Sequence, residues 1–280
     1  PDGPTSRTKQ SRGPGDAPRA EGKQPAIQNQ VIGLAALRPT TSSDMPAVTL
    51  DFDAILFDMD GTLVDSTDGV VGAWELFAEK YPGLDVTAVL SSSHGVRTVE
   101  NLKTHCGVND PEELEREARR FEEAIVAESK KNGRQGIVAL PGVREIMAQI
   151  GPYHKLPKPK WAICTSATVV YATSALKAVG VPIPDAFVVS EDVEKGKPEP
   201  DPYLLGAKRA GVDPSRCLVV EDAPAGVRSG NAAGCKTLGL ITSHSREQME
   251  EVKPDWLVPN LASVTMKPTE NGVQVTINTD

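Results

Sequence analysis

The chain has 280 residues, of which 39% are hydrophobic and 24% are charged, and its formal net charge at pH 7 is −8. This length suits one large domain, or a core with a small accessory domain. An acidic protein repels nucleic-acid phosphates and anionic lipid headgroups, so we expect no nucleic-acid partner and no membrane partner. No apolar run approaches the roughly 20 residues that a membrane-spanning helix needs.

The cysteines are scattered and form no Cys-x-x-Cys pair; they are Cys106, Cys164, Cys217 and Cys235. Cys164 and Cys217 lie inside apolar runs, which is typical of small buried core residues rather than of a disulfide framework. No signal-peptide pattern accompanies them. Together these features favour a reducing, cytoplasmic location.

The first 47 residues are rich in Pro, Gly, Ser, Gln and Arg. Such a composition cannot bury enough apolar surface to offset the entropy lost on ordering. We therefore predict that residues 1–47 form a disordered tail outside the fold. Their Arg-rich, acid-poor character is compatible with organelle targeting, but a passive tail is the simpler interpretation.

The first predicted strand of the core is the apolar run Ala54–Phe57, which ends at Asp58-Met59-Asp60-Gly61. A short apolar run that stops at polar residues and a glycine is typical of a buried strand followed by a sharp loop.

A helical pattern follows, from about Thr67 to Lys131. Pro111 and the two acids after it mark one helix start within this stretch, because proline and acidic residues suit a first turn. Strand signals are few here. We therefore predict a small helical cap domain at residues 67–138, inserted into a core domain made of residues 48–66 and 139–280.

Strands and helices alternate after Leu140. The expected strands are 161–166, 186–190, 217–221 and 236–240, with a last strand at 256–258. The expected helices are 143–150, 169–179, 202–210 and 226–233. This alternation predicts an α/β fold with a doubly wound parallel sheet. Near the C-terminus, Asn271-Gly272 between alternating apolar residues predicts a β-hairpin.

Paired carboxylates follow two of the predicted strands, at the sheet edge where open parallel sheets bind ligands. Asp58 and Asp60 follow the first, while Glu221 ends the strand 217–221 and Asp222 comes directly after it. Carboxylates this close are costly to hold together without a cation, and Mg²⁺ prefers oxygen ligands. A carboxylate can also attack phosphorus while a neighbouring acid protonates the leaving oxygen.

Two further polar blocks lie at the same edge. Lys197, held by the following Pro198, can neutralise the carboxylates and a transferring phosphoryl group. The strand 161–166 ends in Thr165 and Ser166, whose hydroxyls can bind phosphate or simply cap the next helix.

These four blocks, in this order, resemble the haloacid dehalogenase superfamily of phosphotransferases, from about residue 52 to the C-terminus. The helical insert resembles the small cap domain of that superfamily. The resemblance implies a nucleophile, a general acid/base and a charge-neutralising lysine at Asp58, Asp60 and Lys197. It implies a Mg²⁺ site made by Asp58, the main-chain carbonyl of Asp60 and Asp222, with Glu221 in support. The phosphate-binding hydroxyl is Ser166 or its neighbour Thr165.

A narrower resemblance is to fungal glycerol-3-phosphate phosphatases and 2-deoxyglucose-6-phosphate phosphatases. It rests on Ser93–Thr98, on Val220–Gly226 and on the C-terminal hairpin. Cap residues in these enzymes contact the non-phosphate part of the substrate, so His94 and Arg97 are expected to face it, with a helix-surface position as the alternative. The resemblance implies a monomeric, Mg²⁺-dependent phosphatase acting on a small phosphorylated polyol or sugar.

Three alternatives stay open. A phosphomutase of the β-phosphoglucomutase type would use the same aspartates but return the phosphoryl group to a sugar. A non-catalytic protein with this fold would not need all of Asp58, Asp60, Lys197 and Asp222. A dehalogenase needs no metal, which fits poorly with Asp60 and the pair Glu221-Asp222.

Overall fold

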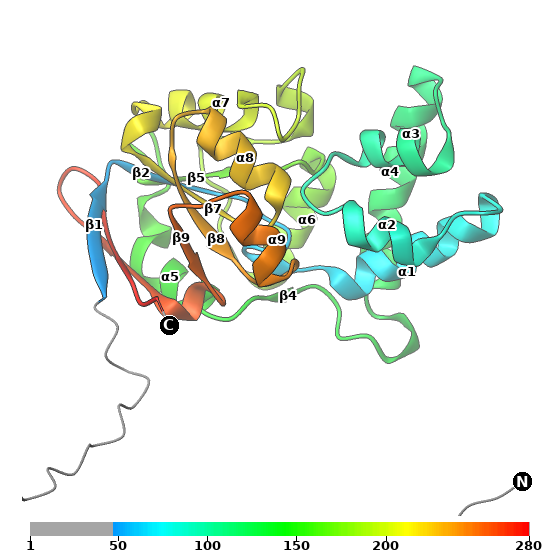
Figure 1. The fold of residues 1–280 in the computed structure, drawn as a ribbon, viewed down its shortest axis with the longest axis horizontal. Coiled ribbons are helices and arrows are strands. Elements are labelled where there is room, and N and C mark those ends of the chain that lie inside the picture. The colour runs from blue at the N-terminus through cyan, green and yellow to red at the C-terminus, as the bar shows by residue number, and fades with distance from the viewer. Residues whose placement is uncertain (1–46, 280) are drawn as a thin grey trace, which may run out of the picture. The chain divides into compact units, whose positions relative to one another are not determined.

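The computed structural model describes residues 47–279 (Figure 1). The tail predicted for residues 1–47 therefore lies outside the described residues, apart from Ala47. A six-stranded parallel sheet forms the centre, in the order β6-β5-β2-β7-β8-β9. Its strands are β2 (Ala54–Phe57), β5 (Trp161–Cys164), β6 (Phe187–Val188), β7 (Cys217–Glu221), β8 (Lys236–Leu240) and β9 (Trp256–Val258). The predicted parallel sheet is confirmed.

The strand expected at 161–166 ends two residues early, at Cys164. The Thr165 hydroxyl accepts a hydrogen bond from the Ala167 N–H at 3.1 Å, which turns the chain out of the sheet. The strand expected at 186–190 is likewise reduced to Phe187–Val188, because a 3₁₀ turn begins at Ser190.

Helices cover both faces of the sheet, because alternate residues of its central strands point to opposite sides. Ile55 and Phe57 pack into the cluster that includes α5 (Val143–Ile150) and α6 (Val169–Val179). Ala54 and Leu56 pack on the other side of the sheet, against α7 (Asp201–Ala210). Helix α8 (Pro224–Ala232) lies on the same side, and α9 (Arg246–Glu251) packs against α8. Both faces are buried, as in a doubly wound fold.

The stretch between β3 (Val64–Asp65) and β4 (Val138–Ala139) carries the helices that we call the helical insert. They are α1 (Thr67–Lys80), α2 (Val86–Ser92), α3 (Thr98–Cys106) and α4 (Pro111–Glu128) (Figure 1). Proline in the first turn and an Asp110 side chain that accepts the Glu113 N–H at 2.9 Å start α4. The division into cap and core domains at residues 67–138 stays a prediction.

Aromatic rings join α1 to α4. The ring centroids of Trp74 and Phe121 lie 4.3 Å apart, and those of Phe77 and Phe121 lie 5.1 Å apart. Each ring is almost fully buried. Burying a side chain of this size contributes about 1.5–3 kcal/mol, so this aromatic cluster stabilises the packing of α1 against α4.

A second, antiparallel sheet has the order β1-β11-β10, with strands β1 (Val48–Phe52), β10 (Val264–Pro268) and β11 (Val273–Ile277). The hairpin predicted at Asn271-Gly272 is confirmed, and it joins β10 to β11. The pairing of β1 with β11 was not predicted, because nothing local in the sequence indicates so distant a partner.

Short 3₁₀ turns complete the chain, at Lys131–Gly133, Gly151–Tyr153, Ser190–Asp192, Pro214–Arg216 and Leu261–Ser263. No helix within residues 47–279 has the length and apolarity that crossing a membrane requires.

Candidate active site

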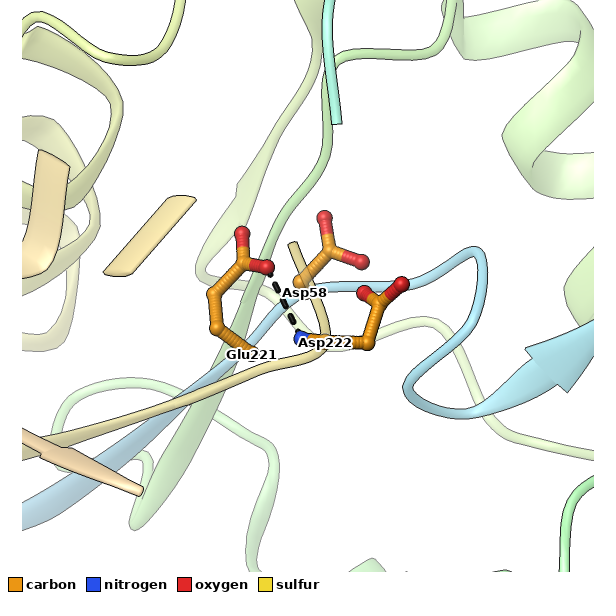
Figure 2. A group of neighbouring side chains, drawn as sticks. All are labelled: Asp58, Glu221 and Asp222. Carbon is orange, nitrogen blue, oxygen red and sulfur yellow. Dashed lines mark hydrogen bonds between the residues drawn. The ribbon is translucent and has the colours of Figure 1, made fainter. Parts of the chain in front are cut away.

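The site lies where the strand order of the parallel sheet reverses, between β2 and β7. Open α/β sheets bind ligands at the carboxyl ends of strands at this place. The N–H of Asp58 donates to the carbonyl of Val220 at 3.0 Å, which sets the end of β2 against the end of β7. Asp58, Glu221 and Asp222 consequently meet, and each offers an oxygen within 4.8 Å of the others (Figure 2).

A glycine allows the loop after β2 to approach these carboxylates. Gly61 has a positive φ of 81°, which favours glycine. A Cβ atom at this position would lie 2.1 Å from Asp222 Oδ2, so no other residue fits without moving the Asp222 carboxylate.

Lys197 is the buried cation of the site. Its Nζ lies 2.5 Å from Asp58 Oδ1 and 2.7 Å from Glu221 Oε1. Burial lowers the pKa of the Lys197 ammonium, but the charges of Asp58 and Glu221 outweigh burial and raise this pKa above its ordinary value. Lys197 is therefore a fixed positive charge at neutral pH, beside the carboxylate proposed as the nucleophile.

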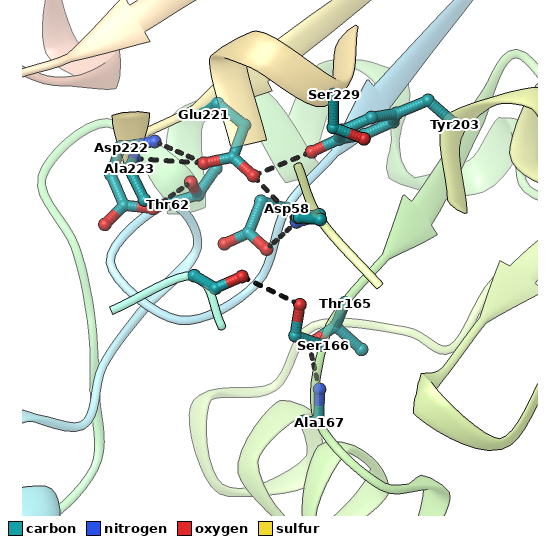
Figure 3. Close-up of polar contacts among 12 residues, drawn as sticks. Asp58, Thr62, Thr165, Ser166, Ala167, Tyr203, Glu221, Asp222, Ala223 and Ser229 are labelled. Atoms are coloured by element: carbon teal, nitrogen blue, oxygen red, sulfur yellow. Dashed lines mark hydrogen bonds and ion pairs between the residues drawn. The ribbon is translucent and has the colours of Figure 1, made fainter. Parts of the chain in front are cut away.

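Glu221 supports its neighbours through all of its lone pairs. Its Oε1 accepts hydrogen bonds from Lys197 Nζ and from the Tyr203 hydroxyl at 2.8 Å. Its Oε2 accepts the N–H groups of Asp222 and Ala223, both at 3.0 Å (Figure 3). A carboxylate has about four such sites. Four donors therefore hold the Glu221 carboxylate in place beside Asp58 and Asp222, whose oxygens are less fully used.

The carboxylate cluster carries more negative charge than Lys197 can balance. Burial raises the pKa of Asp58 well above its ordinary value, although Lys197 opposes the shift. Burial, followed by the charge of Glu221, raises the pKa of Asp222 to about 7. A divalent cation would neutralise the excess and favour the ionised forms. The oxygen donors of Asp58 and Asp222 fit Mg²⁺, which binds through one or two carboxylates and keeps other positions for water and phosphate.

The Asp60 side chain is held away from this cluster. Its Oδ1 accepts hydrogen bonds from Ser66 Oγ at 2.6 Å and from the Tyr171 hydroxyl at 2.7 Å. Its Oδ2 has no partner among the described residues and keeps access to the cavity that Asp60 lines. Burial raises the pKa of Asp60, and the hydrogen bonds from Ser66 and Tyr171 partly oppose this. A raised pKa suits a carboxyl group that must give up a proton near neutral pH.

Replacing Tyr171 by Phe should lower kcat for phosphate release up to about tenfold, because one hydrogen bond that orients the Asp60 carboxyl is worth about 1 kcal/mol. KM should change less, since Tyr171 acts through Asp60. Steady-state kinetics would measure both constants. Tyr153→Phe is the matched control, because Tyr153 is 42% exposed. An unchanged kcat in Tyr171→Phe would contradict this role.

Thr165 and Ser166 both line the cavity, but their hydroxyls are used differently (Figure 3). Ser166 Oγ donates to the carbonyl of Gly95, in the helical insert, at 2.9 Å. Thr165 Oγ1 accepts the Ala167 N–H, and its own proton has no acceptor among residues 47–279. Thr165 is thus free to donate to a phosphate oxygen, whereas the Ser166 proton is already bound.

A cavity of about 80 Å³ lies between the sheet edge and the helical insert. His94 lines this cavity, and burial lowers the pKa of its imidazole, so the ring is neutral at pH 7. Arg97 does not line it. The Arg97 guanidinium pairs with Glu100 at 2.6 Å and reaches the carbonyl of Val193 at 3.4 Å. Of the two insert residues expected to face a substrate, the structure brings only His94 to the cavity.

Several polar residues of the site were not found from the sequence. Thr62 and Ser243 donate to Asp222. Ser66 and Tyr171 donate to Asp60. Glu122 lies in the cavity wall. The helical spacing could have indicated that Glu122 is buried, because it lies four residues after Ala118 on the face of α4 that also buries Phe121. The others are ordinary helix or loop residues in sequence.

Comparisons with known proteins agree with this geometry. The family model described as haloacid dehalogenase-like hydrolase matches residues 52–234. Hexitol phosphatase A of Escherichia coli (strain K12) is 38% identical over 209 residues, which are 75% of this chain and 91% of that protein. Glycerol-1-phosphate phosphohydrolase 2 of Saccharomyces cerevisiae is 33% identical over 206 residues, which are 71% of this chain and 78% of that protein.

Solved structures support the same assignment. A hydrolase from Pseudomonas syringae superposes with a TM-score of 0.64 and 26% identity, covering 75% of this chain and 94% of the other. The superfamily resemblance seen in the four sequence blocks is confirmed. This chain belongs to the haloacid dehalogenase-like hydrolase family.

Proposed function

We propose that this hydrolase is a Mg²⁺-dependent phosphatase that releases inorganic phosphate from a small phosphorylated polyol or sugar. The observation that carries the proposal is the convergence of Asp58, Lys197 and Asp222 at the carboxyl end of the sheet, with the free Oδ2 of Asp60 in the cavity before them. We further propose a monomer that works in the cytoplasm.

In the first step an oxygen of Asp58 attacks the phosphorus atom. A bond forms between Asp58 and phosphorus, and the bond from phosphorus to the substrate oxygen breaks. Asp60, in its protonated form, gives its proton to the leaving oxygen. Lys197 stabilises the charge on the phosphoryl oxygens, and the free hydroxyl of Thr165 donates to one of them. The product of this step is an aspartyl phosphate and a free alcohol.

In the second step Asp60, now ionised, takes a proton from a water molecule that attacks the phosphorus. The bond from Asp58 to phosphorus breaks, which releases inorganic phosphate and returns Asp58 to its ionised form. Mg²⁺, held by Asp58, Asp222 and the main-chain carbonyl of Asp60, would supply positive charge to the phosphoryl oxygens. Uncatalysed hydrolysis of phosphate monoesters is extremely slow, so these charges together must lower the barrier by roughly 20 kcal/mol or more.

The relatives and the cavity support a small substrate. The names of the relatives refer to hexitol phosphate and glycerol 1-phosphate, which are phosphorylated polyols. A cavity of about 80 Å³ is suited to a short alcohol. Its wall contains both polar and apolar groups, as expected for a leaving group with hydroxyls on a carbon chain.

Phosphate release tests the proposal. Purified protein would be assayed with glycerol 1- and 3-phosphate, hexitol phosphates and 2-deoxyglucose 6-phosphate, with Mg²⁺ and again with EDTA. We expect release with Mg²⁺, its loss in EDTA and its return when Mg²⁺ is added back. Release from none of these esters by folded protein, or full activity in EDTA, would contradict the proposal.

The same assay separates the alternatives. A phosphomutase would convert one sugar phosphate into its isomer and release little inorganic phosphate. A non-catalytic protein would do neither, and a dehalogenase would release halide from a haloacid. Ion chromatography of the products distinguishes all of these outcomes.

A further inference from the structure

The wall of the cavity that faces the carboxylate cluster is built mainly by the helical insert. The insert residues in this wall include His94, Thr98, Phe121 and Glu122. Among the described residues that line the cavity there is no lysine and no arginine. The titratable acids in the wall are Asp58, Asp60 and Glu122, and burial lowers the pKa of the His94 imidazole. The part of the cavity that would hold the leaving group therefore contains carboxyl groups and no lysine or arginine among the described residues.

Glu122 is the acidic residue of the insert in this wall. It lies on α4 with its side chain buried, whereas Glu123 beside it is exposed. Ionising a buried carboxyl group is costly unless hydrogen bonds or a cation stabilise it. Lys197, the buried lysine of the site, is already paired with Asp58 and Glu221.

Hydrogen bonds fix the Glu122 carboxylate and leave it one free site. Its Oε1 accepts from the Thr98 hydroxyl at 3.0 Å and from the Thr168 N–H at 3.3 Å. Its Oε2 accepts from the Thr168 hydroxyl. Because a carboxylate has about four acceptor sites, one site on Oε2 can take a further donor. Thr168 belongs to the core, so the carboxylate is held from both the insert and the core.

We propose that Glu122 selects the leaving group: its carboxylate accepts a hydroxyl of a neutral polyol or sugar and rejects substrates that carry a second anionic group. This inference rests on the phosphatase function proposed above and names the substrate class of that site. A second phosphate or a carboxylate in the cavity would meet the Glu122 charge, and no lysine or arginine of residues 47–279 lines the cavity to offset it.

The same arrangement bears on the phosphomutase alternative. That reaction passes through a sugar bisphosphate, whose second phosphate must occupy the compartment for the leaving group. The described residues of this compartment offer it a carboxylate and no cation. The geometry thus favours transfer of the phosphoryl group to water.

A matched pair of esters tests this selection. Glycerol 3-phosphate and 3-phosphoglycerate differ only in that a CH₂OH group is replaced by a carboxylate. Burial raises the pKa of Glu122 to about 7, so assays at about pH 8 keep it mainly ionised. We expect wild-type protein to prefer the neutral ester by about 100-fold in kcat/KM, as a like charge a few ångströms away implies.

Glu122→Gln keeps the size of the side chain and removes its charge. We expect it to lower the preference for glycerol 3-phosphate at least about tenfold, chiefly through faster hydrolysis of 3-phosphoglycerate. Glu123→Gln, one position along the same helix and exposed, should leave the preference unchanged. Glucose 6-phosphate and glucose 1,6-bisphosphate form a second pair, for use if the cavity prefers a hexose.

The outcomes separate the two proposals. Phosphate release by wild type with an unchanged preference in folded Glu122→Gln would overturn the role of Glu122 alone. Equal hydrolysis of both members of a pair by wild type would overturn it as well. Absence of release from every ester would overturn the proposed function and this selection with it. A preference that falls in Glu122→Gln but not in Glu123→Gln would support the proposal.

Discussion

Replacing Asp58 by Asn should abolish phosphate release, with a loss of at least about 10⁴-fold in kcat, because an amide cannot form the acyl phosphate through which the reaction is proposed to pass. The fold should survive. The substitution removes one of three crowded carboxylates, and Lys197 keeps its pairing with Glu221 at 2.7 Å. We expect a thermal unfolding midpoint equal to or above that of wild type. Phosphate release and differential scanning fluorimetry on the same samples would measure both effects.

Asp51→Asn is the matched control for this substitution. Asp51 lies on β1 with an exposed side chain, so both activity and stability should stay within error of wild type. Substantial residual activity in folded Asp58→Asn, within about tenfold of wild type, would remove Asp58 from the role of nucleophile.

Replacing Lys197 by Met should damage both stability and activity. Methionine fills a similar volume without the charge, so Asp58 and Glu221 would be left buried and facing each other without their cation. Removing one partner of a buried ion pair costs about 3–5 kcal/mol in the free energy of unfolding. The lost charge near the phosphoryl group should lower kcat by about 10³-fold or more. Denaturant unfolding and steady-state kinetics would measure the two losses.

Lys195→Met controls for a lysine lost from the same loop. Lys195 is exposed, and its replacement should change the free energy of unfolding by less than about 0.5 kcal/mol. If Lys197→Met were as stable and as active as Lys195→Met, the buried charge of Lys197 would have no part in either property.

Much of the fold could be predicted because each strand of the parallel sheet is a short apolar run with polar residues at its end. Cys217–Glu221 and Lys236–Leu240 match their predicted bounds, since both are followed by residues that leave the sheet. The meeting of Asp58 with Asp222 was also predictable. It follows from a general rule, that carboxyl ends of parallel strands share one edge of a sheet.

The side-chain arrangement inside the site could not be predicted in the same way. Whether Thr165 or Ser166 keeps a free hydroxyl depends on the carbonyl of Gly95, which reaches Ser166 only after the insert packs on the core. The same packing brings the Arg97 guanidinium to the carbonyl of Val193 and Glu122 to Thr168. Such contacts join segments whose relative position no local pattern encodes.

The central claim is that Asp58 forms a covalent aspartyl phosphate. The most direct test is to mix the protein with Mg²⁺ and an active ester, quench within the first turnover, reduce with borohydride and map the peptides by mass spectrometry. Borohydride converts an acyl phosphate to an alcohol, so we expect homoserine in place of Asp58, dependent on substrate and Mg²⁺. Unmodified Asp58 in a protein that turns over, or homoserine at another aspartate, would rule out Asp58 as the covalent nucleophile.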